Sequence, residues 1–316
     1  MKRAIITGAA GFIGSHLTER LLARGETVVG IDNFDPWYEP QIKKQNLLSS
    51  LQHDSFLLIE DDLLSFDLSS ILQKDDVVYH LAGRPGVQDS WGSGFSSSVE
   101  NNILATQRIF EAALTSEVKR VVFASSSSVY GSSASSSSRQ VDPISPYGVS
   151  KAACEQLAQV YRSRGLDVMA MRYFTVYGPR QRPDMAMNRL FRAALPGDYV
   201  FPLRGTGAQR REFTFVEDIV DATIRAGSTE AKNIHEPFDI GGGVSASLGE
   251  VIEKVEQIVG SSVRIELQSA AKGDPLITVA DTEPAQEILN WQASTELQNG
   301  LEKHYVSVLE ALQLTE

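Results

Sequence analysis

Tyr147 and Lys151 are separated by about one turn of an α-helix, so a helix here places the phenol and the ammonium on one face. A free tyrosine has a pKa of about 10, and a cation within about 4–6 Å lowers the pKa of an acid by about 1–3 units. The pair is therefore suited to general-base catalysis by Tyr147. The same spacing also occurs in ordinary amphipathic helices. Whether this pair is catalytic therefore depends on the residues around it.

A glycine-rich segment near the N-terminus is suited to bind a phosphate group. Gly8, Gly11 and Gly14 lie between an expected strand, Arg3–Thr7, and an expected helix, Gly14–Arg24. Such a turn lets the backbone approach a pyrophosphate, and the helix N-terminus offers free N–H groups to it. The spacing is G-x-x-G-x-x-G, a variant of the G-x-G-x-x-G dinucleotide pattern.

A carboxylate, Asp32, follows the second expected strand, Thr27–Ile31, about 20 residues after Gly11. An acid at this place accepts hydrogen bonds from the adenosine ribose and repels a 2′-phosphate. The two features together predict NAD as cofactor in preference to NADP. The alternative is a structural turn followed by a surface aspartate.

Ser126 belongs to a run of serines that ends the expected strand Val121–Ser125. Its hydroxyl is suited to donate a hydrogen bond to a substrate oxygen or to relay a proton to Tyr147.

Short β-branched runs alternate with helical patterns in the first half of the chain. This alternation, with strands that read as continuous apolar runs, predicts an α/β fold with a Rossmann-type doubly wound parallel sheet. We expect an NAD-binding domain over 1–174 and a smaller C-terminal substrate lobe over 175–316, with segments near 214–240 returning to the first domain. Further strands are expected at Phe56–Glu60, Val77–Leu81 and Val168–Tyr173, and further helices at Ile42–Leu51, Asn101–Thr115 and Pro146–Arg164.

Composition narrows the class of protein. The 316 residues include 40 acidic and 29 basic side chains, a formal charge of −11, which argues against a nucleic-acid-binding protein. The single cysteine, Cys154, cannot form an internal disulfide, and no stretch approaches the length of about 20 apolar residues that a membrane span needs. We therefore expect a soluble cytoplasmic protein with no membrane partner, nucleic-acid partner or metal site.

Three further features favour structural interpretations. His80 is expected to be a core histidine that is hydrogen-bonded to the backbone. Cys154 is expected to be a buried packing residue. The serine-rich stretch 125–138 is expected to be mostly an exposed, mobile loop.

Over essentially its whole length the chain resembles the extended short-chain dehydrogenase/reductase family of NAD-dependent epimerases and dehydratases, and within it the UDP-glucuronic acid 4-epimerases. The resemblance implies a homodimer formed through the helices near 101–115 and 147–164. The motifs that carry it are TGAAGFIG at 7–14, HLA at 80–82, SSSSVYG at 125–131, SPYGVSK at 145–151, RYFTVYGPRQRPDM at 172–185, REFTFVEDIV at 211–220 and GDP at 273–275.

The resemblance also implies roles for individual residues. Ser126, Tyr147 and Lys151 are the implied catalytic residues. The implied NAD-binding residues are Gly8, Gly11, Phe12, Ile13, Gly14, Asp32, Asn33, Asp62, Leu63, Leu81, Ala82, Asn102, Tyr147, Lys151 and Tyr173.

The two residues that precede the VYG tripeptide indicate which reaction of the family to expect. Dehydratases of the family carry an Asp-Glu pair there and decarboxylases a Glu, whereas this chain has Ser127 and Ser128. The remaining path from a 4-keto sugar is epimerisation, for which UDP-glucuronate and UDP-galacturonate are the expected substrate and product. A UDP-glucose/UDP-galactose 4-epimerase, a UDP-sugar decarboxylase or dehydratase, and a non-enzymatic NAD sensor are the alternatives.

Substrate contacts are expected in the second lobe. Segment 172–211 carries eight arginines against two aspartates, and a solvated basic face is the alternative for about half of them. Gln88 stands where relatives carry Arg, so a phosphate contact is expected to weaken unless Arg84 replaces it; Thr206 and Lys272 also depart from the pattern. The implied substrate-binding residues are Ser127, Ser128, Thr175, Arg182 and Asn188, with Arg211 for the diphosphate and Asp274 for the ribose.

Overall fold

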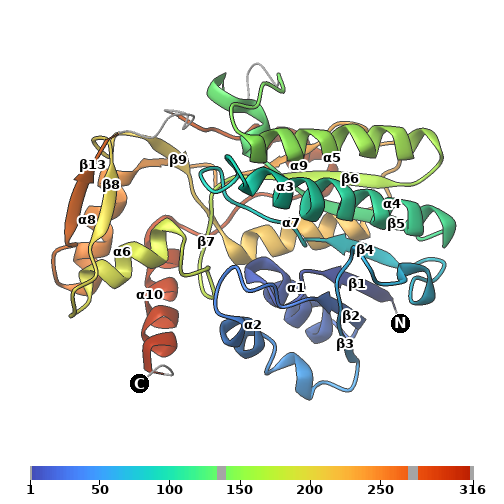
Figure 1. The fold of residues 1–316 in the computed structure, drawn as a ribbon, viewed down its shortest axis with the longest axis horizontal. Helices are drawn as coiled ribbons and strands as arrows, with labels where there is room; N and C mark the ends of the chain where they lie inside the picture. The colour runs from blue at the N-terminus through green and yellow to red at the C-terminus, as the bar shows by residue number, and fades with distance from the viewer. Residues whose placement is uncertain (1, 134–139, 270–276, 314–316) are drawn as a thin grey trace.

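A seven-stranded sheet lies at the centre of the computed structural model, which describes residues 2–133, 140–269 and 277–313 (Figure 1). The strand order is β11-β6-β5-β4-β1-β2-β3, and every pair of neighbours is parallel. The predicted Rossmann-type doubly wound fold is thereby confirmed. The strands are β1 Arg3–Thr7, β2 Thr27–Asp32, β3 Phe56–Glu60, β4 Val77–His80, β5 Arg120–Ser126, β6 Val168–Tyr173 and β11 Phe238–Ile240.

Helices cover both faces of this sheet. In β1, Ala4 and Ile6 pack into the cluster on the α1 and α7 side, whereas Ile5 packs into the cluster formed with α4 and α5. Successive strand residues point to opposite faces, so burial of both faces explains the continuous apolar runs. The helices of this half are α1 Phe12–Ala23, α2 Pro40–Asn46, α3 Gly94–Ser98, α4 Ala105–Thr115 after a π-helical turn at Val99–Leu104, α5 Pro146–Ser163 and α7 Val216–Ser228.

The second lobe is made of short strand pairs and helices, on the left in Figure 1. β8 Phe201–Arg204 pairs with β13 Ile265–Gln268, and α6 Ala186–Ala194 packs against α8 Leu248–Val259 and α10 Leu297–Gln313. The remaining strand pairs are β7 Val176–Tyr177 with β10 Thr214–Phe215 and β9 Arg210–Glu212 with β12 Ser245–Ser247. α9 Glu283–Leu289 packs instead against β11 and α7, beside the central sheet.

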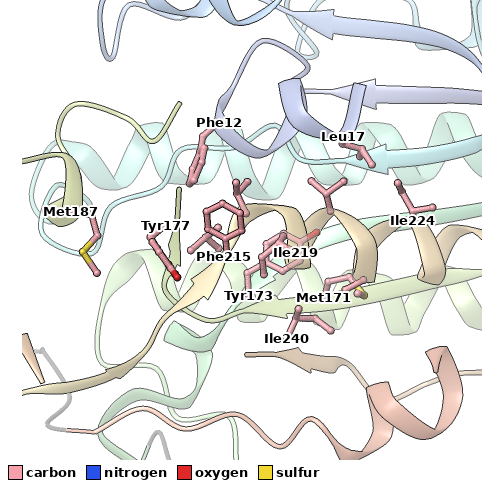
Figure 2. Close-up of a cluster of buried hydrophobic side chains, with 14 of the residues drawn as sticks. Phe12, Leu17, Met171, Tyr173, Tyr177, Met187, Phe215, Ile219, Ile224 and Ile240 are labelled. Carbon is pink, nitrogen blue, oxygen red and sulfur yellow. The ribbon is translucent and has the colours of Figure 1, made fainter. Parts of the chain in front are cut away.

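The chain returns to the sheet after the second lobe has begun. β11 pairs with β6, and α7 packs against α1. Figure 2 shows one buried cluster in which Phe12 of α1, Met171 of β6 and Met187 of α6 lie together with Ile219 of α7. The two parts of the molecule therefore share a hydrophobic core. Within the described residues, no helix is both long enough and apolar enough to span a bilayer.

A buried ion pair ties α5 to the sheet. Arg172 of β6 donates two hydrogen bonds to the carboxylate of Glu155 on α5, at 2.9 and 2.7 Å, and both side chains are about 5% exposed. Arg172 also donates to the Tyr130 hydroxyl at 2.6 Å, which donates to Asp239 of β11 at 2.7 Å. The hydroxyl of Ser125, at the end of β5, donates to Glu155 as well. One network therefore joins β5, α5, β6 and β11.

Replacing Glu155 by Gln is expected to lower the free energy of unfolding by about 3–5 kcal/mol, because the Arg172 guanidinium stays buried without its counter-charge. Equilibrium unfolding in denaturant measures this loss. The control is Asp221→Asn, which breaks a surface pair with Arg225, and exposed pairs contribute only about 0–1 kcal/mol. Equal losses in the two variants would contradict the expectation.

Candidate active site

A cavity of about 440 Å³ opens at the carboxyl ends of the parallel strands. Ligands bind at this edge in doubly wound sheets, because the loops after neighbouring strands converge there. The cavity is lined from the glycine-rich turn after β1, through the loops after β2, β3 and β4, to the serines that end β5 and the residues that follow β6.

The glycine-rich turn forms one wall of the cavity. Gly8 has a φ of +71°, and a Cβ there would lie 2.8 Å from the backbone nitrogen of Ala82, so only glycine fits. α1 begins at Phe12 with Gly11 as its N-cap, and no side chain caps it. The N–H groups of its first turn therefore have no intrahelical partner, which is the arrangement that binds a pyrophosphate.

Asp32 lies at the end of β2 and lines the same cavity. Its two carboxylate oxygens accept hydrogen bonds from the backbone N–H groups of Ala10, at 3.0 Å, and Phe34, at 2.9 Å. Burial raises the pKa of this carboxyl, and the nearby Lys43 ammonium opposes the rise. The carboxylate is thus held rigidly at the place where a dinucleotide ribose binds in this fold.

Most of the expected NAD contacts meet in this cavity. Asn33 donates to Asp62 at 2.9 Å, which joins the loops after β2 and β3. The ring of Tyr173 lies in the buried cluster of Figure 2, and its hydroxyl shares a 2.7 Å hydrogen bond with Thr223 of α7. Expected NAD-binding residues that line the cavity are Gly8, Gly11, Phe12, Ile13, Gly14, Asp32, Asn33, Asp62, Leu63, Leu81, Ala82, Tyr147, Lys151 and Tyr173.

The expected catalytic residues line the cavity together. Ser145 caps α5 by accepting a hydrogen bond from Gly148 N at 3.1 Å, so Tyr147 lies in the first turn and Lys151 one turn further. The Lys151 ammonium is buried and donates to the carbonyl of Ala124 in β5 at 2.9 Å. Tyr147, Lys151 and Ser126 thus come from two elements that pack side by side.

The first residues of the serine-rich stretch differ from the exposed loop that was expected for most of it. Ser125 and Ser126 are buried at the end of β5, and Ser127–Ser133 form 3-10 turns. The Ser126 hydroxyl accepts a hydrogen bond from Ser128 N at 3.1 Å and donates to Ser128 Oγ at 3.1 Å. Hydrogen bonds within the cluster therefore order its first residues, whereas 134–138 lie outside the described residues.

His80 is buried, as expected, but its partners are not backbone atoms. Its ring nitrogens lie 2.7 Å from Thr7 Oγ1 and 3.0 Å from Thr106 Oγ1. Burial, with a smaller contribution from the Lys151 charge, lowers its pKa to about 3, so the ring is neutral. Cys154 is buried on α5, close to the Asn102 carbonyl and to Thr106, which agrees with a packing role.

The expected substrate-binding residues divide into two groups. Ser127, Ser128, Thr175 and Arg182 line the cavity, and the Arg182 guanidinium binds both oxygens of Asp184, at 3.0 and 2.9 Å. Asn188 and Arg211 are not in the lining: Asn188 donates to the Gln181 carbonyl at 3.1 Å and Arg211 to the Arg210 carbonyl at 2.9 Å. Asp274 lies outside the described residues.

Asn102, an expected NAD-binding residue, does not line the cavity. It is buried, and its side-chain amide binds the backbone of Arg84 in both directions and the Ser150 hydroxyl. Its role in the structure is to hold the loop after β4.

The arginine-rich segment 172–211 does not form one basic face. Arg172 is buried with Glu155, Arg180 pairs with Glu19 at 2.7 Å, and Arg210 pairs with Glu250 at 3.1 Å. Of its eight arginines, all within the described residues, Arg182 alone lines the cavity.

Several cavity residues were missed by the sequence reasoning. They come from the loop after β2 and from α2, which follows that loop. The signal that identifies them is position, because residues directly beyond the carboxyl ends of neighbouring parallel strands face one edge. These residues are Asp35, Trp37, Tyr38 and Lys43. Arg84, considered above as a replacement phosphate contact, also lines the cavity.

Comparisons with known proteins agree with this geometry. The model of the NAD dependent epimerase/dehydratase family matches residues 4–241. A Bacillus subtilis protein described as an uncharacterized UDP-glucose epimerase is 40% identical over 95% of both chains, and a UDP-glucuronate 4-epimerase of Thermodesulfobacterium geofontis is 33% identical over 95% of this chain and 94% of its own.

A crystal structure of the Bacillus cereus UDP-glucuronic acid 4-epimerase, in complex with UDP-glucuronic acid and NAD, superposes with a TM-score of 0.92. It is 39% identical and covers 98% of this chain and 99% of its own. The glycine-rich turn, Asp32 and the Rossmann-type sheet match what a family of this kind requires. The chain therefore belongs to the NAD dependent epimerase/dehydratase family and is an epimerase that uses NAD.

Proposed function

We propose that the protein interconverts UDP-glucuronate and UDP-galacturonate by epimerisation at C4, through a transient 4-keto sugar, with Tyr147 as general base. The observation that carries this proposal is that one cavity is lined both by Tyr147, Lys151 and Ser126 and by Thr175 and Arg182. Similarity to UDP-glucuronate 4-epimerases over nearly the whole chain supports the same substrate.

The residues of the chain account for the proton chemistry. The glycine-rich turn and Asp32 would hold NAD, which would supply a hydride acceptor for the oxidation at C4 and, once reduced, the hydride donor for the return step. Tyr147 removes the proton of the 4-hydroxyl and gives it back in the second half of the reaction. The Lys151 ammonium stabilises the phenolate, and Ser126 donates a hydrogen bond to the same sugar oxygen.

The distribution of carboxylates in the cavity supports epimerisation over the alternatives. Among the described residues that line it, the carboxylates are Asp32, which ends β2, Asp35, which follows β2, and Asp61 and Asp62, which follow β3. At the end of β5 the lining consists of serine hydroxyls. No described carboxylate of the lining therefore follows β5, where dehydratases and decarboxylases of the family carry theirs.

The C5 carboxylate of the proposed substrate needs a partner. Oxidation at C4 makes a β-keto acid, which loses CO2 readily when the carboxylate bond aligns with the carbonyl π system. Arg182, with Thr175 and the Ser127 and Ser128 hydroxyls, is suited to hold that bond out of alignment, because a guanidinium binds a carboxylate through two parallel hydrogen bonds.

A UDP-glucose 4-epimerase is the second candidate. The Bacillus subtilis relative carries that description, and Arg182 is already neutralised by Asp184. A neutral sugar would leave this pair undisturbed, whereas an acidic sugar must share or displace Asp184.

Incubation of the NAD-loaded enzyme with UDP-glucuronate, followed by NMR of the products, is expected to yield UDP-galacturonate. Conversion of UDP-glucose alone would favour the second candidate, a UDP-pentose product would indicate a decarboxylase, and inertness toward every UDP-sugar would contradict an epimerase.

Tyr147→Phe is expected to slow the conversion by about 10²–10⁴-fold, because the base is lost. An unchanged rate would remove Tyr147 from the mechanism.

Arg182→Gln is expected to lower kcat/KM for UDP-glucuronate by about 10–100-fold, since a hydrogen bond to a charged group contributes about 1.5–3 kcal/mol. Turnover of UDP-glucose is expected to change little, and a UDP-pentose side product is expected to appear. Arg180→Gln is the control, because Arg180 lies in the same loop but pairs with Glu19 outside the cavity. Unchanged activity of Arg182→Gln on the acidic sugar would contradict the proposed carboxylate contact.

We also propose a homodimer formed through the helices near 101–115 and 147–164, which in the structure are the π-helical turn Val99–Leu104, α4 and α5. Exposed apolar side chains lie on these packed helices: Leu104 of the π-helical turn is 46% exposed, and Val149 and Val160 of α5 are 45% and 58% exposed. Phe95 on the neighbouring α3 is 44% exposed. Val149 and Val160 lie eleven residues apart on α5, about three turns, and so share one face.

Sedimentation of the double variant Val149→Glu/Val160→Glu is expected to show a monomer, since charges would be buried against the partner. Val306→Glu on α10, where Val306 is 54% exposed, is expected to leave the oligomeric state unchanged. A native protein that sediments as a monomer would refute the proposal.

A further inference from the structure

A side-chain contact crosses the cavity between two loops that are not adjacent in the sheet. In the strand order β4-β1-β2, the loop after β4 and the loop after β2 lie on opposite sides of β1. Arg84, after β4, donates from Nη1 to Asp35 Oδ1, after β2, at 2.8 Å. Its guanidinium carbon also lies 3.6 Å from the ring centre of Trp37. The contact therefore spans the end of β1, where the glycine-rich turn begins.

The Arg84 side of the contact is fixed to the fold by Asn102. The Arg84 N–H donates to Asn102 Oδ1 at 2.7 Å, and Asn102 Nδ2 donates back to the Arg84 carbonyl at 3.1 Å. Asn102 itself is 1% exposed. The backbone of Arg84 is thus held at both polar groups by one buried side chain, which aims the guanidinium across the cavity.

Asp35 is held in place by hydrogen bonds that do not involve Arg84 or Asn102. The carboxylate of Asp35 accepts the N–H of Trp37 at 2.8 Å, and its carbonyl accepts a hydrogen bond from Lys43 Nζ at 2.9 Å. Lys43 is 8% exposed and belongs to α2. Each loop therefore keeps its shape through its own bonds, and the Arg84 side chain joins the two.

The contact between Arg84 and Asp35 lies between the glycine-rich turn and solvent, as its place in the cavity lining and the exposure of its two side chains indicate. Asp35, Trp37 and Arg84 line the same cavity as Gly8 and Gly11. The side chains of Arg84 and Asp35 are 23% and 35% exposed, so the pair forms part of the outer wall of the cavity. Bonds of this kind, at the rim, open and close without unfolding the sheet beneath them.

We propose that Arg84, Asp35 and Trp37 form a clasp that closes over the dinucleotide groove and retains NAD between turnovers. An epimerase returns its cofactor to the starting oxidation state, so NAD has no need to leave, and a clasp that slows its release carries no kinetic penalty. The inference depends on NAD as the cofactor and not on which sugar is epimerised.

The test measures the rate at which the holoenzyme releases NAD, not its catalytic activity. The holoenzyme is loaded with radiolabelled NAD, excess unlabelled NAD is added, and the retained label is measured over time. Arg84→Gln and Asp35→Asn are each expected to release NAD about tenfold faster, as expected for the loss of a partly exposed ion pair together with a cation–π contact. Trp37→Leu is expected to have a smaller effect, because the ion pair remains.

Two comparisons distinguish a clasp from a general weakening of the fold. The double variant Arg84→Gln/Asp35→Asn is expected to release NAD no faster than Arg84→Gln alone, because Arg84→Gln already removes the ion pair that Asp35→Asn breaks. Arg225→Gln, which breaks a pair of similar length with Asp221 on α7, is expected to leave the release rate unchanged. Unchanged release in both single variants, additive effects in the double variant, or equal acceleration by Arg225→Gln would each overturn the proposal.

Discussion

The buried pair between Glu155 and Arg172 fixes the geometry on which the site depends. Glu155 lies one turn after Lys151 on α5, and its carboxylate also holds Ser125, the neighbour of Ser126. Removing two charges from water is costly, and only a fully hydrogen-bonded arrangement compensates for it. α5, β5 and β6 are therefore constrained to one relative position. That constraint keeps the phenol and ammonium of α5 opposite the serine hydroxyls of β5.

Most of the sheet is predictable from the sequence, because strands buried on both faces read as continuous apolar runs. The bounds of β1, β3 and β6 agree with the expected ones. β11 is less accessible to such reasoning, since a strand as short as Phe238–Ile240 depends on tertiary partners such as β6 and α9. The expected helix Ile42–Leu51 starts earlier, at Pro40, because a proline favours the first turn of a helix, and it ends at Asn46.

In the site, it was easier to predict which residues line the cavity than which residues they bind. Residues just beyond a strand end, such as Asp32 and Ala82, line the cavity because topology brings them there. The partners of Asn102 and Asn188 depend on tertiary contacts that residue type does not reveal. Local charge is equally uninformative: Arg180 is neutralised by Glu19, which lies far away in the sequence.

Carboxylates and uncharged hydroxyl groups line different parts of the cavity. Its described carboxylates lie after β2 and β3, where ribose hydroxyls need acceptors, and its serine hydroxyls lie after β5, beside Tyr147. Hydroxyl groups at the reacting end donate and accept hydrogen bonds but are far too weak as bases to remove a carbon-bound proton. Under the proposed reaction, a single strong base therefore faces the sugar. A 4-keto sugar held there has few paths open to it except reduction, and reduction from the opposite face gives the epimer.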